Sequence, residues 1–200
     1  ALVNYVLNYE LLRPHNVEGT RELLRFAFSD RRKEFHHISS TFIFGWTAKP
    51  TLLETDNNDE MMNLDFGYSQ SKWVAEQLVL GARRQGLKVR IYRPSLISAS
   101  TQGVWDGNDI AIRLLTFMIN HGIAVHTRNQ ISFLPADIVA DNIACLFKQR
   151  DIAGSTVHVT ADEYYNMRHI TEAITADYGY PFVYYDISGF ITEMNRRCTQ

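Results

Sequence analysis

The sequence predicts an α/β fold, in which crossover helices join the strands of a parallel sheet, followed by a smaller C-terminal lobe. Helical and extended segments alternate through the first half of the chain, which is typical of parallel sheets. After Ala99 the elements become shorter and suit a substrate-binding lobe. We therefore expect residues 1–99 to form the sheet domain and residues 100–200 mainly the lobe, with some returns to the sheet. The 200 residues, 46% of them hydrophobic, can bury a sizeable core.

The composition narrows the class of protein. A net charge of −2 offers no basic field for a nucleic acid or an anionic membrane. No apolar run is long enough to span a bilayer, and the first residues lack the features of a signal peptide. Cys145 and Cys198 are far apart, so we expect no disulfide framework and a reducing, cytoplasmic location. The chain starts without Met in an apolar pattern, which is what we expect of the middle of a larger protein.

Two helical segments come first. Apolar side chains recur at helical spacing at Leu2, Tyr5, Val6, Tyr9 and Leu12. Pro14 suits the first turn of a second helix, where its missing N–H costs nothing, and the apolar face continues to Ala27. Asn16 lies on this inward face. Its amide can bridge backbone groups or hold a water behind a catalytic lysine, and the sequence alone slightly favours the first role.

The next segment is extended and ends in three hydroxyl side chains, Ser39, Ser40 and Thr41. Hydroxyls at that place suggest a ligand site, because ligands bind beyond the carboxyl ends of strands in open α/β sheets. These hydroxyls can equally satisfy backbone groups at the strand end, and without other motifs the sequence favours this structural role. The adjacent His36 and His37 point to opposite faces of the strand, and no cluster with metal-ligand spacing accompanies them, so we expect both to be structural.

A polar, acidic loop from Trp46 to Phe66 precedes a long helix. Loops of this length in compact domains are often functional. The helix follows Gly67, runs to about Arg84 and ends near Gly86, since glycine is favoured just past a helix C-terminus. Residues 87–94 alternate between apolar and polar side chains and predict the next strand.

Tyr68 and Lys72 lie four residues apart on this helix and therefore on the same face. The Lys72 ammonium near the Tyr68 oxygen would favour the phenolate, so we expect the pKa of Tyr68 to fall below its reference of about 10. A phenol tuned in this way can give a proton to a carbonyl oxygen, or take one from a hydroxyl, near neutral pH. Such pairs are common in helices, and alone this one also fits an exposed Tyr and a solvated Lys.

The remaining segments are shorter. Asp109 can cap a helix that ends near Gly122. A short strand and a helix follow between residues 131 and 147. The later predicted elements are a strand at 155–160, a helix at 167–178, an extended segment at 181–185 and a helix at 187–197. Aromatic residues are dense in this last part, where they can line a pocket but more often serve packing.

Several motifs together resemble the extended short-chain dehydrogenase/reductase family, whose fold is Rossmann-like. The matching motifs are an Asn-Val-x-Gly-Thr helix, the catalytic strand end, the Tyr-x-x-x-Lys pair and a following Arg-Pro turn. They stand at Asn16–Thr20, at Ser39–Ser40 with Gly45, at Tyr68 with Lys72, and at Arg93–Pro94. Each motif is weak by itself, but their shared order and spacing argue against coincidence.

The resemblance is closer to one branch of that family, the terminal thioester reductase domains of nonribosomal peptide and polyketide synthetases, with carboxylic acid reductases and aminoadipate reductases. It covers roughly residues 2 to 148, and the last fifty residues are less specific. It implies NAD(P)H-dependent reduction of a carrier-bound acyl or peptidyl thioester to an aldehyde, or on to an alcohol. NADPH is the implied cofactor, with NADH as the alternative. The implied partner is a carrier protein whose phosphopantetheine holds the substrate.

The same resemblance assigns roles to residues. Ser40 matches the catalytic hydroxyl; most members of the branch have Thr there, so Thr41 is the alternative, although the spacing to Gly45 favours Ser40. Tyr68 would donate the proton, and Lys72 would tune Tyr68 and anchor the cofactor ribose. Asn16 would support the catalytic lysine. The residues that would lie by the nicotinamide are Pro94, Ser95 and Leu96.

The chain departs from the family pattern at one point. The glycine-rich phosphate loop of the family precedes the Asn-Val-x-Gly-Thr helix, and no such loop is found in these 200 residues. We expect the first strands of the sheet to be absent with it, and these residues alone to bind a dinucleotide poorly. Two other functions stay open: an epimerase or dehydratase of the same family that acts on a nucleotide sugar, and a non-catalytic interaction module.

Overall fold

The structure, a computed structural model, forms two compact units. It describes residues 1–45, 47, 49–105, 107, 109–150, 152 and 154–198; Trp46, where the predicted loop begins, lies outside them. The first unit comprises Ala1–Ser95 and Val139–Val159, and the second comprises Leu96–Ile138 and Thr160–Gln200. No helix among the described residues is long and apolar enough to cross a membrane.

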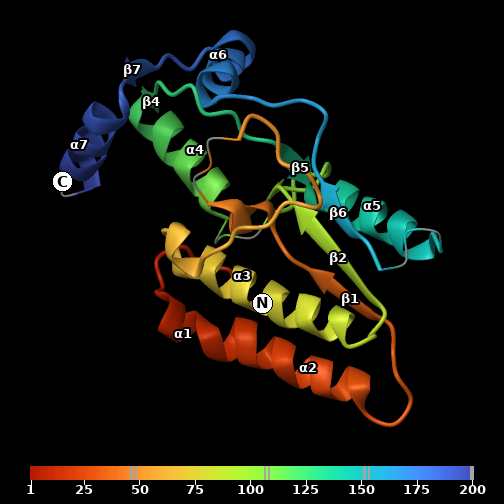
Figure 1. Cartoon of the computed structure of the whole chain (residues 1–200). Helices are drawn as coiled ribbons and strands as arrows, with labels where there is room; N and C mark the ends of the chain where they lie inside the picture. The colour runs from red at the N-terminus through yellow and green to blue at the C-terminus, as the bar shows by residue number, and fades with distance from the viewer. Residues whose placement is uncertain are drawn as a thin grey trace. The chain divides into compact units, whose positions relative to one another are not determined.

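A parallel sheet with the strand order β1-β2-β6 forms the centre of the first unit (Figure 1). Its strands are β1 (Phe35–Ile38), β2 (Val89–Pro94) and β6 (Thr156–Val159). In the register, His37 lies opposite Ile91, and Tyr92 lies opposite Val157. Every residue of the central strand β2 is buried, as expected for a parallel strand between two neighbours. The predicted α/β class is confirmed.

Helix α3 (Gly67–Arg84) is the crossover between β1 and β2, and its bounds confirm the predicted helix. Two further helices, α1 (Tyr9–Arg13) and α2 (Gly19–Phe28), pack along α3 (Figure 1). The apolar core between the helices and the sheet is formed by Leu24, Ala27, Val79, Ala82, Leu87, Val89 and Ile91.

The predicted helix over Leu2–Leu12 is wrong in its first half, because helical structure starts only at Tyr9. The Asn4 side chain accepts hydrogen bonds from the backbone of Val6 and Leu7, which holds a turn in place of a helix. Asn8 then caps α1 through the Leu11 N–H. Pro14 does not begin a separate helix: it opens a π-helical turn, Pro14–Glu18, that links α1 to α2.

Gly67 sets how closely α3 approaches the N-terminal segment. A Cβ atom at this position would lie 2.4 Å from the backbone carbon of Asn8 and 2.5 Å from the carbonyl oxygen of Leu7. Only glycine leaves room for this contact. The first turn of α3, which carries Tyr68, is therefore packed directly against the backbone that leads into α1.

The loop before α3 is fastened to the interior by a buried ion pair. Arg93 at the end of β2 pairs with Glu76 on α3 across 2.6 Å, and the side chains are 2% and 0% exposed. The same guanidinium donates to the Asp56 carbonyl oxygen at 2.8 Å. From α3, the Trp73 indole donates to the Asn58 carbonyl oxygen at 2.8 Å. These bonds satisfy a buried charge and hold the loop at the same time.

In its described residues, the second unit contains two small parallel strand pairs and three complete helices. One pair joins β3 (Leu96–Ser98) to β5 (Phe133–Pro135), and the other joins β4 (Ile123–Val125) to β7 (Val183–Tyr185). Its helices are α4 (Ile110–His121), α6 (Met167–Tyr178) and α7 (Ile187–Cys198), while α5 (Ala136–Lys148) runs on into the first unit. The predicted cap and stop of α4 are confirmed, since Asp109 accepts from Ala111 and Ile112 and Gly122 has φ 62°. The core of the unit is formed by Met118, Ile123, Ala124, Met167 and Phe190.

Candidate active site

Ser40 lies just beyond the carboxyl end of β1, where the chain turns into a 3₁₀-helix, Thr41–Phe44. Its backbone is extended and its Oγ accepts a hydrogen bond from the Phe42 N–H at 3.2 Å, so Ser40 caps that helix. The side chain is buried, with 5% of the residue exposed. The Ser40 side chain also makes a hydrogen bond with the Tyr68 phenol.

Tyr68 and Lys72 occupy the first two turns of α3 and are both buried. The Lys72 ammonium donates a short hydrogen bond to the carbonyl oxygen of Ile38, the last residue of β1. The rings of Tyr5 and Phe42 pack against the Tyr68 ring, with centroids 5.2 Å and 6.4 Å away. The crossover helix and the end of β1 thus bring the strand-end hydroxyl, the phenol and the ammonium into one region.

Burial raises the pKa of Tyr68 above its usual value, and its interaction with the Ser40 side chain only partly opposes this rise. The predicted fall in the pKa of Tyr68 is therefore wrong. The physical reason is desolvation, which disfavours the phenolate, while the Lys72 ammonium is bonded to a backbone carbonyl. The contact with Ser40 identifies the hydroxyl that lies by the phenol.

The pKa of Lys72 is shifted in the opposite direction from that of Tyr68. Burial lowers the pKa of its ammonium to about 8, and the Glu76 carboxylate one turn further along α3 acts in the other direction. At neutral pH the ammonium is still the main form. A buried cation is therefore held within the first unit next to the end of β1.

Asn16 lies in the π-helical turn, where its amide bridges two parts of the first unit. Its side-chain oxygen accepts from the Leu2 N–H at 2.6 Å, and its side-chain nitrogen donates to the Leu2 carbonyl oxygen at 3.0 Å. The same nitrogen donates to the Ser71 hydroxyl at 2.9 Å. This geometry fits the backbone-bridging role, and it fixes α3 between Tyr68 and Lys72.

The other predicted site residues are more dispersed. Thr41 begins the 3₁₀-helix and is only half-buried, so its environment differs from that of Ser40. Pro94 ends β2, and the backbone N–H of Ser95 donates to the Val159 carbonyl oxygen of β6 at 3.0 Å. Both lie at the carboxyl edge of the sheet, as Ser40 does. Leu96 opens β3 and is part of the second unit.

His37 and Ser39 are close to this region, although His37 was expected to be structural and Ser39 was one of three strand-end hydroxyls with both roles open. Burial and the Lys72 ammonium lower the pKa of His37 to about 3, so the imidazole is neutral at physiological pH. Among the described residues, the Nε2 of His37 and the Oγ of Ser39 have no hydrogen-bond partner. Strand alternation, which puts His37 and Ser39 on the same face of the extended segment, was the signal that could have grouped them.

No group of three or more His, Cys, Asp or Glu side chains in the described part of the chain could hold a metal ion. The donors at the edge of the sheet are hydroxyls, an ammonium and a phenol. This set suits hydrogen bonding to an oxygen-rich organic ligand.

Comparisons with known proteins identify the family of the chain. The model of the family NAD_binding_4, described as Male sterility protein, matches residues 1–143. Glycine betaine reductase ATRR of Emericella nidulans is 34% identical over 196 residues, covering 90% of this chain and 14% of that protein. Aldehyde reductase lnbA of Aspergillus flavus is 33% identical over 170 residues, covering 80% of this chain and 17% of that protein. The chain is therefore a small part of the length of either relative.

A solved structure matches the whole chain. The terminal R domain from the myxalamid PKS-NRPS biosynthetic pathway superposes with a TM-score of 0.95 at 30% identity, covering 100% of this chain and 51% of that one. The predicted family is thereby confirmed. The chain belongs to the NAD_binding_4 family, in the thioester reductase branch of the extended short-chain dehydrogenases/reductases.

Proposed function

We propose that this chain carries the proton-handling part of an NAD(P)H-dependent reductase that converts a carrier-bound acyl or peptidyl thioester to an aldehyde. The observation that carries the proposal is the convergence of Ser40, Tyr68 and Lys72 in the buried region at the carboxyl end of β1. Membership of the thioester reductase branch supports the reaction type. The substrate, the carrier protein and the choice between NADPH and NADH are parts of the proposal.

Ser40 and Tyr68 would hold the carbonyl oxygen of the thioester. Both are hydroxyl donors, and two such donors stabilise the negative charge that develops on that oxygen. The raised pKa of Tyr68 suits this role, because a phenol that keeps its proton at neutral pH can donate a hydrogen bond and then the proton. Once a hydride has added to the carbonyl carbon, the oxygen would take the Tyr68 proton and give a hemithioacetal. Its C–S bond would then break, the sulfur would take up the hydroxyl proton, and the aldehyde and the free thiol would leave. A second round would give the alcohol.

Lys72 would act on Tyr68 and on the cofactor ribose. Its ammonium, fixed to the Ile38 carbonyl, provides a positive charge one helical turn from the phenol. As Tyr68 gives up its proton, this charge stabilises the phenolate that results. The ammonium has two further N–H donors for ribose hydroxyls.

The residues present fit one half of a nicotinamide dinucleotide. The unpartnered buried Ser39 Oγ, the Lys72 ammonium and the Tyr68 hydroxyl form a donor set for a ribose at the carboxyl edge of the sheet. When bound, the cofactor supplies the hydride that adds to the carbonyl carbon. The glycine-rich turn that binds a pyrophosphate is not among these residues.

The intact protein, assayed with NADPH and an acyl-pantetheine thioester, tests the proposal. We expect NADPH oxidation that depends on the thioester, together with one equivalent of free thiol and an aldehyde trapped as its hydrazone. NADH in place of NADPH measures the cofactor preference, and the acyl group loaded on a carrier protein measures the gain from the partner. Retention of a UDP-sugar with no response to any thioester would contradict the proposal and favour the nucleotide-sugar alternative.

A further inference from the structure

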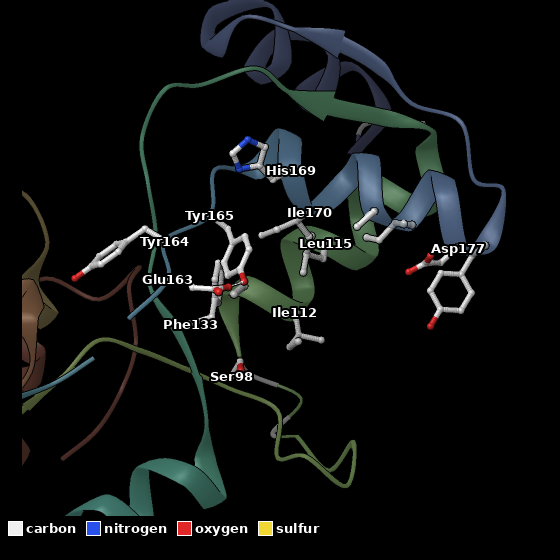
Figure 2. A pocket seen from close by; sticks show the side chains of 14 residues that line it. Ser98, Ile112, Leu115, Phe133, Glu163, Tyr164, Tyr165, His169, Ile170 and Asp177 are labelled. Carbon is white, nitrogen blue, oxygen red and sulfur yellow. Dashed lines mark hydrogen bonds between the residues drawn. The ribbon is translucent and has the colours of Figure 1, made fainter. Parts of the chain in front are cut away.

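A hollow of about 770 Å³ lies entirely within the second unit. Figure 2 shows its lining on α4 and α6, with Leu115 of α4 next to Ile170 of α6. Its volume is in the range of sites that hold drug-sized organic molecules. None of the residues assigned to the reductase chemistry lines it.

Helix α6 presents an apolar stripe to the hollow. Met167 and Thr171 are 5% and 0% exposed and lie on the buried side of the helix. Ile170, which also packs against the core, forms the stripe with Ala173 and Ile174 at positions i, i+3 and i+4, and all three line the hollow. An apolar stripe that lines a hollow offers burial to an apolar ligand, because removing such surface from water is favourable.

Aromatic side chains form another part of the wall. Tyr164, Tyr165 and Tyr178 line the hollow, and 50%, 41% and 74% of their surfaces are exposed. Tyr165 is held in place by a backbone bridge to Ile131, with N···O distances of 3.0 Å and 2.8 Å. Tyrosine rings combine a large apolar area with an electron-rich face, which attracts organic cations.

The charges in the lining are all of one sign. Glu163 accepts a hydrogen bond from the Tyr165 hydroxyl, and Asp177 lies towards the opposite end of the hollow (Figure 2). The other polar side chains of the lining are Ser98 and His169, and no Lys or Arg is among the described residues that form it. The hollow would therefore repel carboxylates and phosphates and attract a cation.

We propose that this hollow is a binding site for an apolar organic cation, a ligand with an alkyl or aryl body and a protonated or quaternary amine. The stripe of α6 and the lining side chains of α4 bury the apolar body. The tyrosine rings and the carboxylates of Glu163 and Asp177 select the positive charge. The proposal does not depend on thioester reduction, because ligand binding to this hollow can be measured without any reaction.

Calorimetric titration of the intact protein with three probes of equal chain length tests the proposal: octylamine, octanol and octanoate. We expect octylamine to bind about three- to tenfold more tightly than octanol, as a partly exposed charge contact allows, and octanoate to bind most weakly. Asp177→Asn and Glu163→Gln should each reduce the preference for the amine and leave octanol binding unchanged. Ala173→Phe, which adds a large side chain to the lining, should abolish binding of all three probes.

Glu172→Gln is the matched control, because Glu172 is also on α6 but pairs with Arg168 and does not line the hollow. We expect this variant to keep the full preference for octylamine. Equal affinity for the three probes, or loss of the preference in Glu172→Gln as well, would overturn the assignment of a cation site. Failure of all three probes to bind would overturn the site itself. A Tyr68→Phe variant should bind the probes normally, so the outcome is separate from that of the reductase assay.

Discussion

The Lys72 ammonium is bonded to the carbonyl oxygen of Ile38, which ties the crossover helix α3 to the carboxyl end of β1. This bond holds the cation in the interior, where burial lowers its pKa to about 8. It also keeps Lys72 one helical turn from Tyr68. The pKa of the Tyr68 phenol is itself raised by burial.

The lowered pKa of Lys72 predicts opposite pH dependences for activity and stability. Activity should fall as the pH rises through about 8, because the ammonium that supports Tyr68 is then lost. Stability should rise between about 8 and 10.5, since the folded state releases the proton there while the unfolded state keeps it. Lys72→Met should lower kcat/KM by about 100-fold and remove the fall in activity above about pH 8. Lys88→Met, in the surface loop before β2, is the control, and a basic limb that survives in Lys72→Met would contradict the assignment.

Ser40 and Thr41 can be separated by substitution. Ser40→Ala should lower kcat/KM by about 10- to 1000-fold, the range seen when one donor to a developing oxyanion is removed. Thr41→Ala should change it little, because Thr41 is half-buried and is not the hydroxyl that contacts Tyr68. Steady-state rates of thioester-dependent NADPH oxidation measure both. A larger loss in Thr41→Ala than in Ser40→Ala would assign the role to Thr41.

His37 makes the fold sensitive to acid. Its pKa is lowered from 6.5 to about 3 by burial and by Lys72, so below pH 6.5 the unfolded state binds a proton that the folded state does not. The free energy of unfolding should therefore fall by ~2–3 kcal/mol between neutral pH and about pH 4.5. Urea denaturation of the intact protein at both pH values measures this loss. We expect His37→Gln to abolish most of the loss, and an unchanged loss would show that another group is responsible.

The close approach at Gly67 predicts a large effect of a single methyl group. Gly67→Ala places a Cβ 2.4 Å from the Asn8 backbone, so α3 or the N-terminal segment must shift. We expect a loss of about 1–3 kcal/mol in the free energy of unfolding. Gly81→Ala on the same helix is the matched control, since its Cβ would meet nothing closer than 3.8 Å. It should stabilise the protein by about 0.5–1 kcal/mol, and equal effects of both changes would refute the packing argument.

Local patterns in the sequence accounted for much of the fold and the site. The spacing of Tyr68 and Lys72 placed both on one face of α3, and the hydroxyls after β1 pointed to the carboxyl edge of the sheet. The caps of α4 at Asp109 and Gly122 were equally readable, because capping depends on neighbouring residues. Residues only a few positions apart in the sequence determine these features.

The features that sequence reasoning missed depend on distant contacts. The sign of the Tyr68 pKa shift follows from burial, which no spacing rule reports, and the Lys72 bond joins residues 34 positions apart. The apolar spacing over the first eight residues suggested a helix, but the Asn4 side chain accepts from the backbone of Val6 and Leu7 and holds a turn there. The aromatic residues that the sequence offered as a possible pocket lining include Tyr164, Tyr165 and Tyr178, but the parts of the hollow that come from β3, α4 and α6 have no motif of their own.

The most direct test of the central claim is the rate of thioester-dependent NADPH oxidation by Tyr68→Phe in the intact protein. The phenylalanine ring keeps the contacts with Tyr5 and Phe42 but has no proton to donate. We expect kcat/KM to fall by at least about 100-fold, with the unfolding midpoint nearly unchanged, whereas Tyr180→Phe, at an exposed position, should keep the wild-type rate. A Tyr68→Phe rate equal to that of the wild type would contradict the proposed role of Tyr68 as the proton donor.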